Sequence, residues 1–460
     1  MENVRVKDIV AAVGGRLLCG DPETLVMGAA IDSRAVKAGD IFVPIIGERT
    51  DAHRFIKQVL ENGAAATFTS EHDEVSDSHA WIRVDDTVKA LQQLGAWYRT
   101  KLDMPFIGIT GSVGKTTTRE MVAAALSAGK RVYSTKGNSN GQIGLPLTLI
   151  GADPSYDIGV LEMGMSMPGE MPVIARIAGA SAAIITMIGV SHIENLGSRE
   201  NICAEKLHIT DGFGEDNTAI FNGDEPMLEA LKGKTPYRIL YFGHGEECDY
   251  RCESVESDAE GVSFVAVTPS GKLNVRLRVP GEHNVMNALA ALAAADLFGV
   301  SLESAAEALG SYQGMSRRLN IRKLDNGVTI IDDAYNASPE SMKAAFGVLD
   351  SMKPADGGRK AMVLADMLEL GEDSPCFHTE TGENAAKVHA DRYFLIGSLA
   401  EYMEKAITQA GESAELFEGN KAAAKAISRW MRPGDIILVK GSNGMKLGEV
   451  ISFMESTELA

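Results

Sequence analysis

A glycine-rich segment between an apolar strand and a helix constrains this chain more than any other feature. The segment is Phe106-Ile-Gly-Ile-Thr-Gly-Ser-Val-Gly-Lys-Thr-Thr-Thr118, and a helix-like run over 120–126 follows it. This order is typical of a phosphate-binding P-loop, in which backbone N–H groups at a helix start face the phosphates. Lys115 would reach the β/γ oxygens, and the Thr116 hydroxyl would ligate Mg²⁺. The predicted nucleotide contacts are Gly111, Ser112, Gly114, Lys115, Thr116 and Thr117.

The loop departs from the standard P-loop pattern at one position. Ile109 stands where a glycine is usual, and the glycines are Gly108, Gly111 and Gly114. The alternative to a nucleotide site is therefore a glycine-rich turn that binds nothing. The Gly-Lys-Thr sequence directly between a strand and a helix favours the nucleotide site.

Composition limits the kinds of partner and compartment. A net charge of -19 argues against general binding to nucleic acid or to an anionic membrane, since both would repel the chain. The five scattered cysteines fit a reducing compartment. No signal peptide is evident, and the most apolar stretches are too short to span a bilayer. We expect a cytoplasmic protein without membrane insertion.

The pattern of strands and helices predicts an α/β fold with three domains, as the length also suggests. Residues 1–102 form a small α/β unit, and a new strand starts after Met104-Pro105. Residues 103–312 hold the P-loop, buried strands over 157–163 and 182–188, a β-like stretch over 237–279 and an alanine-rich helix over 285–298. Residues 313–460 alternate strands and helices in the manner of a doubly wound, Rossmann-like sheet. Ser338-Pro-Glu340 predicts a helix start.

Several polar residues follow buried strands, where open α/β sheets bind ligands. Glu162 ends such a strand and is a candidate Mg²⁺ ligand, the alternative being a carboxylate that caps a turn. His192 and the pair Asp332 and Asp333 have similar positions. The alternative for His192 is a loop histidine with a backbone partner, and for the two aspartates it is turn or cap chemistry. Asn284 and Asn287 lie one helical turn apart and can face one ligand, although Asn284 could instead cap the helix. Lys206 by itself would be an ordinary solvated lysine.

Taken together and in this order, these segments resemble the Mur ligases of peptidoglycan synthesis. The resemblance covers essentially the whole chain and includes the variant P-loop, Glu162, the His192 segment, Pro280-Gly-Glu-His-Asn-Val-Met-Asn287 and Arg318. It extends to Asp32-Ser-Arg34 and to residues 42–55, which resemble the family's UDP-sugar domain. The segments that resemble the ligase for D-alanyl-D-alanine are Lys136-Gly-Asn-Ser-Asn-Gly-Gln-Ile-Gly144, Asp332-Asp-Ala-Tyr-Asn-Ala-Ser-Pro339 and Ala365-Asp-Met-Leu-Glu-Leu-Gly371 with His378.

The resemblance implies an enzyme that uses ATP to join D-alanyl-D-alanine to UDP-N-acetylmuramoyl-tripeptide through an acyl phosphate. It implies two Mg²⁺ ions held by Thr116, Glu162, His192 and a carbamylated Lys206. Lys115, Lys206, His192 and Asp333 would be catalytic, while Asn284, Asn287 and Arg318 would contact the nucleotide. The implied substrate contacts are Ser33, Arg34, Asn138, Asn140, Tyr335 and Asn336.

Two alternatives stay open from the sequence. One is another ligase of the same family, such as the tripeptide-forming enzyme or a folylpolyglutamate synthetase. The other is a P-loop regulatory NTPase that forms no bond. We expect a monomer, and the sequence does not tell whether the third residue of the tripeptide is lysine or diaminopimelate.

Overall fold

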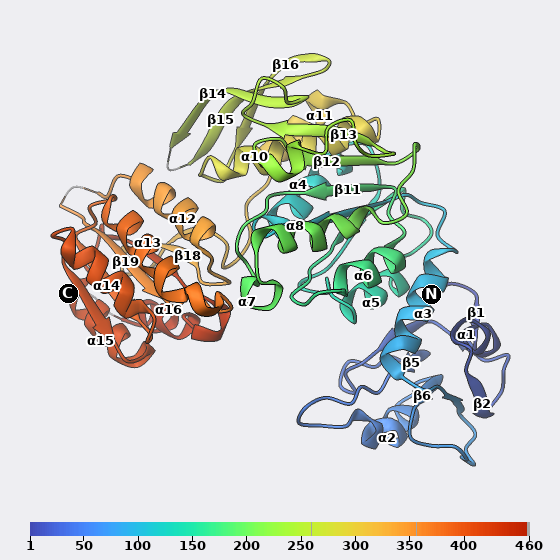
Figure 1. Ribbon diagram of the computed structural model, residues 1–460. Coiled ribbons are helices and arrows are strands. Elements are labelled where there is room, and N and C mark those ends of the chain that lie inside the picture. The colour runs from blue at the N-terminus through green and yellow to red at the C-terminus, as the bar shows by residue number, and fades with distance from the viewer. Residues whose placement is uncertain (259, 356, 458–460) are drawn as a thin grey trace.

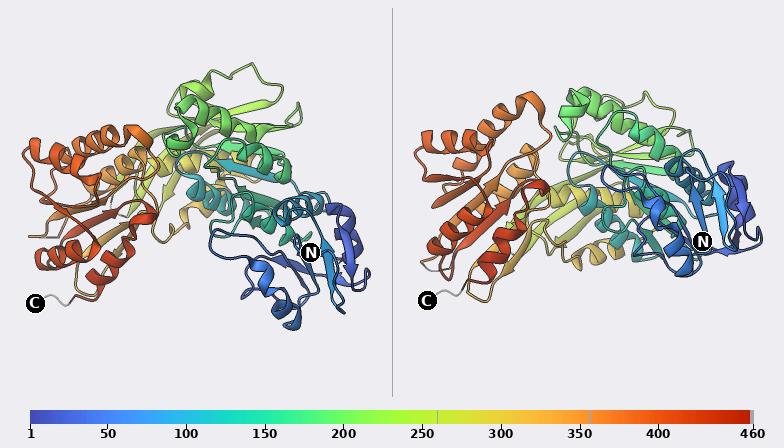
Figure 2. Two further views of the ribbon diagram at one scale, coloured as in Figure 1. Left: turned by 60° about the horizontal axis from the view of Figure 1, so that its bottom comes forward. Right: turned by 90° about the horizontal axis from the view of Figure 1, so that it is seen from below.

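Each of the three predicted regions contains a sheet of its own in the computed structural model of this chain. The structure describes residues 1–258, 260–355 and 357–457. The three lobes form an arc, with the N-terminal and C-terminal lobes at its two ends and the central lobe between them (Figure 1, Figure 2). The α/β fold and its mostly parallel sheets are confirmed. The boundaries near residues 102 and 312 remain a proposal.

The N-terminal domain is a mixed sheet with helices packed against it. Its sheet has the order β2-β7-β6-β5-β4, in which only β2 pairs antiparallel among the described strands. A short pair of strands, β1 and β3, lies beside it. The elements are β1 Val4–Arg5, α1 Val6–Val13, β2 Arg16–Cys19, β3 Leu25–Val26, β4 Gly28–Ala30, β5 Asp40–Phe42, the 3₁₀ helix η1 Ala52–Phe55, α2 Ile56–Glu61, β6 Ala66–Thr69, β7 Ala80–Arg83 and α3 Thr87–Arg99.

The central domain is built on a sheet with the order β16-β15-β14-β13-β12-β11-β8-β10-β9. The strands from β9 to β14 pair in parallel, and β15 and β16 extend the sheet antiparallel. The elements are β8 Phe106–Thr110, α4 Lys115–Ser127, β9 Val132–Ser134, α5 Gly144–Ile150, β10 Ile158–Glu162, α6 Glu170–Ala178, β11 Ala182–Ile185, α7 Ile193–Leu196, α8 Arg199–Leu207, η2 His208–Thr210, β12 Thr218–Asn222, α9 Pro226–Glu229, β13 Arg238–Gly243, β14 Tyr250–Asp258, β15 Gly261–Thr268, β16 Gly271–Leu277, α10 His283–Leu297 and α11 Leu302–Gly310.

The C-terminal domain is a doubly wound sheet, as the repeated strand–helix pattern predicts. Its order is β17-β18-β22-β19-β20-β21, and β17 pairs antiparallel with β18. The predicted helix start is confirmed, because the Ser338 side chain caps α12 at Ser341 N. The elements are β17 Asn320–Lys323, β18 Thr329–Asp333, α12 Pro339–Ser351, β19 Lys360–Ala365, η3 Gly371–Asp373, α13 Ser374–Ala386, β20 Arg392–Ile396, α14 Ala400–Gln409, β21 Ala414–Phe417, α15 Asn420–Trp430, β22 Ile436–Lys440, η4 Asn443–Met445 and α16 Gly448–Glu455.

The central sheet places the P-loop beside the ends of its neighbouring strands. β8 pairs with β10 on one side and with β11 on the other. In this register Ile109 lies opposite Glu162 and Ile184, and its side chain is fully buried. Ile109 is therefore the penultimate residue of the strand, and the turn starts only after Thr110. In a search of the described residues, no helix is long and apolar enough to cross a membrane.

Candidate active site between the central and C-terminal domains

The predicted nucleotide residues line a cavity of about 550 Å³ where the central and C-terminal domains meet. The cavity lies at the carboxyl ends of both parallel sheets, where such folds bind ligands. Most of the predicted site residues line it: Ser112, Gly114, Lys115, Thr116, Thr117, Asn138, Asn140, Glu162, His192, Asn284, Asn287, Arg318, Asp333, Tyr335 and Asn336. Gly111, Lys206, Ser33 and Arg34 do not line it.

The P-loop backbone fits a phosphate. Gly111 has φ +150°, and a Cβ there would lie 1.9 Å from Thr186 Oγ1, so no larger residue fits. Gly114 has φ +87° and is the N-cap of α4, where no side chain caps the helix. The first N–H groups of a helix have no partner within it, so these donors suit an anion. The loop therefore has the form that phosphate binding requires.

Lys115 supplies positive charge to this loop. Its Nζ donates to Gly111 O at 2.8 Å and to Ser112 O at 3.3 Å. Among the ion pairs between described residues, none involves Lys115. Burial lowers the pKa of this amine, while the Glu162 carboxylate opposes that shift. A polyanion in the cavity would offset the desolvation of the Lys115 charge.

Glu162 connects the P-loop helix to the 136–144 loop. Its Oε2 accepts from the buried Arg119 guanidinium at 3.2 Å, and its Oε1 accepts from Asn140 Nδ2 at 2.8 Å. Arg119 also donates to Gly137 O at 3.1 Å, so it contacts the same loop. None of the hydrogen bonds among described residues uses the Thr116 hydroxyl. A carboxylate and a free hydroxyl are hard oxygen donors, so this pair fits Mg²⁺.

His192 and Lys206 lie close to Lys115. Burial and the Lys115 charge lower the pKa of His192, and the Glu369 carboxylate raises it. Lys206 lies in α8 and is almost fully buried. Burial, together with Lys115, lowers the pKa of Lys206 well below its ordinary value. Lys206 is therefore not the ordinary solvated lysine that its sequence position alone suggests.

The two predicted asparagines hold the start of α10 against the P-loop helix. Asn284 Nδ2 donates to Pro280 O at 2.8 Å, and Asn287 Nδ2 donates to Asn284 Oδ1 at 3.2 Å. Thr118 of α4 donates to Asn287 Oδ1 at 3.0 Å. The N-cap position of α10 is Glu282, so the alternative in which Asn284 caps the helix is wrong.

Asp333 from the C-terminal domain completes the far side of the cavity. Its carboxylate accepts from Leu319 N at 3.1 Å and from the buried Lys440 ammonium. Lys440 also donates to Asn336 O at 3.0 Å, and therefore fixes the loop after β18. The Arg318 guanidinium lies over the Tyr335 ring, 4.2 Å from its centroid. These contacts are intramolecular and leave the cavity open to a ligand.

Comparisons with known proteins agree with this geometry. Three family models match consecutive parts of the chain: the Mur ligase family catalytic domain at 26–99, the Mur ligase middle domain at 109–295 and the Mur ligase glutamate ligase domain at 317–443. The UDP-N-acetylmuramoyl-tripeptide–D-alanyl-D-alanine ligase of Bacillus subtilis is 40% identical over 463 residues, and 99% of each chain is covered. The chain belongs to the Mur ligase family.

Solved structures extend the likeness over the full length of this Mur ligase. The crystal structure of MurF from Acinetobacter baumannii matches with a TM-score of 0.90 and 31% identity, covering 98% of each chain. The MurF ligase of Thermotoga maritima in complex with ADP matches with a TM-score of 0.84 and 28% identity, covering 95% of this chain and 98% of the other. The neighbour with ADP shows that a protein with this fold and architecture binds an adenine nucleotide.

The structure does not bring the N-terminal candidates of this Mur ligase into the cavity. Arg34 is exposed and pairs with Asp32 at 2.6 Å, and Ser33 is its neighbour in the chain. Both residues lie in the N-terminal domain, at the other end of the arc from the C-terminal domain (Figure 1). Any substrate that contacts Ser33 or Arg34 and also reaches Lys115 must therefore extend from the N-terminal domain to the central domain.

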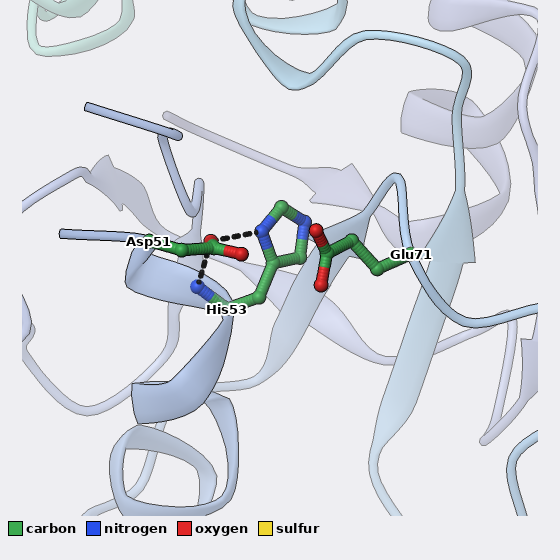
Figure 3. Close-up of side chains that lie close together, drawn as sticks. All are labelled: Asp51, His53 and Glu71. Atoms are coloured by element: carbon green, nitrogen blue, oxygen red, sulfur yellow. Dashed lines mark hydrogen bonds and ion pairs between the residues drawn. The ribbon is translucent and has the colours of Figure 1, made fainter. Parts of the chain in front are cut away.

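A group of possible metal ligands in the N-terminal domain does not form a metal site. Asp51, His53 and Glu71 place their ligand atoms within 4.8 Å of one another (Figure 3). The buried His53 uses both ring nitrogens, since Nδ1 lies 2.7 Å from an Asp51 oxygen and Nε2 accepts from Ser70 N at 3.1 Å. An ion bound by His53 would have to displace one of these hydrogen bonds. The hydrogen bonds themselves therefore explain why the three side chains lie together.

Arg119, which pairs with Glu162, and three further charged residues of this Mur ligase site escaped the sequence prediction. Lys440 and Glu340 line the cavity, and Glu369 contacts His192. Lys440 ends the buried strand β22, so the strand-end argument used for Glu162 would also have found it. Glu340 belongs to the predicted helix start and Glu369 to the segment 365–371, but the sequence indicated no contact role for either, because their partners lie 150 and 177 residues away.

Proposed function

We propose that this Mur ligase joins D-alanyl-D-alanine to UDP-N-acetylmuramoyl-tripeptide with hydrolysis of ATP to ADP and phosphate, in peptidoglycan precursor synthesis. The observation that carries the proposal is the full-length match to the ligase of that name from Bacillus subtilis, at 40% identity. The cavity at the P-loop gives the reaction a physical site, because it unites nucleotide-binding groups with polar groups of the C-terminal domain.

The chemistry requires that two anions meet. The terminal carboxylate of the tripeptide attacks the γ-phosphorus of ATP, which gives an acyl phosphate and ADP. The amine of D-alanyl-D-alanine then attacks the acyl carbon, phosphate leaves, and the amine loses its proton as the amide forms. Because the carboxylate and the triphosphate repel each other, the site must supply positive charge in fixed positions. Lys115 and the N-terminus of α4 would bind the phosphates, and Arg318 would add charge from the C-terminal domain.

Metal ions would add to this positive charge. Thr116 and Glu162 would hold one Mg²⁺ at the nucleotide, and His192 with a carbamylated Lys206 would hold a second. Bound there, Mg²⁺ would neutralise phosphate charge as the carboxylate approaches. Asn140 and Arg119 would orient Glu162, because each donates to one of its carboxylate oxygens.

The environment of Lys206 supports its carbamylation. A neutral amine adds to CO₂ and releases one proton, and a lowered pKa raises the neutral fraction of the amine. The product carries an anionic oxygen, whereas an ammonium cannot ligate Mg²⁺. Lys206 lies near the positive charge of Lys115, so an anion at this position is also favoured electrostatically.

Removal of CO₂ tests the carbamate. Activity in CO₂-depleted buffer should fall and return on adding bicarbonate, and the intact mass should change by one CO₂ group. Lys206→Ala should lose activity and regain part of it with added acetate, which can supply a carboxylate. Equal activity with and without CO₂ in the wild-type protein would contradict the carbamate and leave the ligase proposal intact.

The remaining candidates would bind substrates. Asn138, Asn140, Tyr335 and Asn336 would contact the peptide or the dipeptide near the cavity. Ser33 and Arg34 would contact the distant UDP end of the muramoyl substrate, whose length would span the gap between the N-terminal domain and the cavity.

We propose that domains 1–102, 103–312 and 313–460 act within one monomer. The five cysteines, all described and all unpaired, support a cytoplasmic setting.

Phosphate release tests the function directly. Release from ATP should require both UDP-N-acetylmuramoyl-tripeptide and D-alanyl-D-alanine, and the product mass should equal their sum minus water. L-alanyl-L-alanine is the matched control and should not be ligated. Release that needs neither substrate would indicate a regulatory NTPase, and release with a different acceptor would indicate another ligase of the family.

A further inference from the structure

Two glutamates of the C-terminal domain contact the loop that carries His192. The Glu340 carboxylate, at the start of α12, accepts from Val190 N at 2.9 Å. The Glu369 carboxylate accepts from His192 Nδ1, and the Glu369 carbonyl accepts from Glu194 N at 3.4 Å. The loop 189–194 is thus held from two separate elements of the neighbouring domain. Neither glutamate belongs to the predicted site.

The contacts leave little room on either side of the loop. A Cβ on Gly189 would lie 2.4 Å from Glu340 Oε1. A Cβ on Gly371, two residues after Glu369, would lie 3.3 Å from the Cα of Glu194. The loop and these two C-terminal elements are therefore in close contact, and a side chain at Gly189 or Gly371 would force a shift between them.

The residues that meet across this contact have an unusual backbone. His192 has φ +66° and Glu369 has φ +64°, both in the left-handed region. Such conformations are disfavoured for non-glycine residues and persist where surrounding contacts determine them. The His192–Glu369 contact is one of the contacts that offset this cost.

The contact also determines the state of the imidazole. A carboxylate only accepts hydrogen bonds, so Nδ1 of His192 carries the proton. In the neutral ring Nε2 then has a free lone pair. No hydrogen bond among the described residues uses Nε2, and the His192 side chain lines the cavity. A carboxylate partner that fixes the tautomer in this way is a common support for metal-binding histidines.

We infer that Glu340 and Glu369 are positioning residues that hold His192, in its Nδ1-protonated tautomer, toward the nucleotide cavity. The C-terminal domain thereby completes the central domain's site through backbone and histidine contacts as well as through Asp333 and Arg318. The inference rests on the proposed function in one respect, namely that His192 acts at the nucleotide.

Side-chain ¹⁵N NMR of histidine-labelled protein tests the tautomer without any substrate. The signals of His192 are assigned by their loss in His192→Gln. We expect Nδ1 protonation in the wild-type protein and in Glu369→Gln, which keeps an acceptor oxygen. Glu369→Ala should lose this preference. Glu372→Ala is the matched control, since Glu372 is exposed in the same segment and should leave the His192 signals unchanged.

Mn²⁺ binding gives the second readout. Electron paramagnetic resonance follows Mn²⁺ binding in the presence of a non-hydrolysable ATP analogue. The half-saturating Mn²⁺ concentration should rise about 10- to 100-fold in Glu369→Ala. Glu340→Gln should raise it less, and Glu372→Ala should match the wild type. The thermal midpoint verifies folding, and Glu369→Asp, which shortens the side chain by one methylene, replaces Glu369→Ala if that variant does not fold.

An unchanged tautomer and unchanged Mn²⁺ binding in folded Glu369→Ala would overturn the inference. If both change while the protein fails to ligate D-alanyl-D-alanine, the proposed function fails and the positioning of His192 stands. If ligation proceeds normally and neither readout changes, the proposed function stands and the inference fails.

Discussion

The central domain meets its two neighbours through junctions of different character. At the junction with the N-terminal domain, helix α3 packs on α5 and α6, and one apolar cluster includes buried residues from both domains. Gly95 lies so close to Pro146 that a Cβ at Gly95 would be 2.7 Å from the Pro146 Cβ. At the junction with the C-terminal domain, Val190 joins the apolar core of that domain. A cavity of about 550 Å³ with many charged and polar side chains in its lining lies beside it, and glutamate contacts hold the His192 loop.

The difference assigns stability to one junction and chemistry to the other. Apolar burial stabilises without a specific ligand, so the first junction keeps the N-terminal and central domains together. Charged and polar groups are costly to bury unless they are paired, so the second junction gains from a ligand that pairs them. Substitutions at the two junctions should therefore have separable effects on unfolding and on activity.

The largest effect should come from Lys115→Ala at the polar junction. Loss of this ammonium should lower kcat of the ligation by about 10²- to 10³-fold, as expected for a group that stabilises developing charge in a transition state. Unfolding should be little affected, because burial already disfavours this charge. Ligation kinetics and chemical denaturation of the same preparation measure both quantities. If Lys115→Ala instead lost much of its unfolding free energy and kept a normal kcat, the assignment of chemistry to this junction would be wrong.

Gly95→Ala at the apolar junction should act in the opposite way. The added methyl would overlap Pro146, and overpacking of this kind costs about 1–3 kcal/mol of unfolding free energy. At temperatures below the unfolding transition, the ligation activity of Gly95→Ala should stay within about twofold of the wild-type activity. Gly347→Ala is the matched control, because Gly347 lies within α12 and a Cβ there meets nothing within 4 Å. Helix propensity predicts that this control is stabilised by up to about 1 kcal/mol.

The smallest effect should be a pH dependence that originates at the polar junction. His283 lines the cavity, and burial lowers its pKa from 6.5 to about 4. Between these values the unfolded chain binds the proton and the folded chain does not, so stability falls as the pH drops through this window. The wild-type protein should lose unfolding free energy between pH 7 and pH 5. In His283→Gln this loss should be smaller by about 1–2 kcal/mol. Denaturation at both pH values provides the measurement, and an unchanged slope would contradict it.

The elements with strong local signals were predictable. The buried strands β8, β10 and β11, the capped start of α12 and the β-rich stretch 237–279 all follow the sequence pattern. The helix after the P-loop is longer than expected and begins at Lys115, because the loop glycines turn the chain immediately into it. The irregular Ile109 belongs to the strand, which only the register with Glu162 shows.

The candidate site was predictable only in part. Residues at strand ends or in a recognisable motif were found, and most of them line one cavity. The roles assigned to them stay predictions. Lys440 was overlooked although it ends a buried strand. Arg119, Glu340 and Glu369 were not found because their partners lie 43, 150 and 177 residues away in the sequence. Arg119 reads as an ordinary helix residue until it pairs with Glu162.

The sequence by itself determined that this chain is an α/β protein with a phosphate-binding loop and the motifs of a Mur ligase, because glycine turns, buried strands and helix starts are local properties. Only the tertiary structure decided which polar groups share the cavity, which tautomer His192 adopts and which junction is apolar. Those properties depend on contacts between residues far apart in the sequence, and such contacts exist only after the sheets have formed and packed.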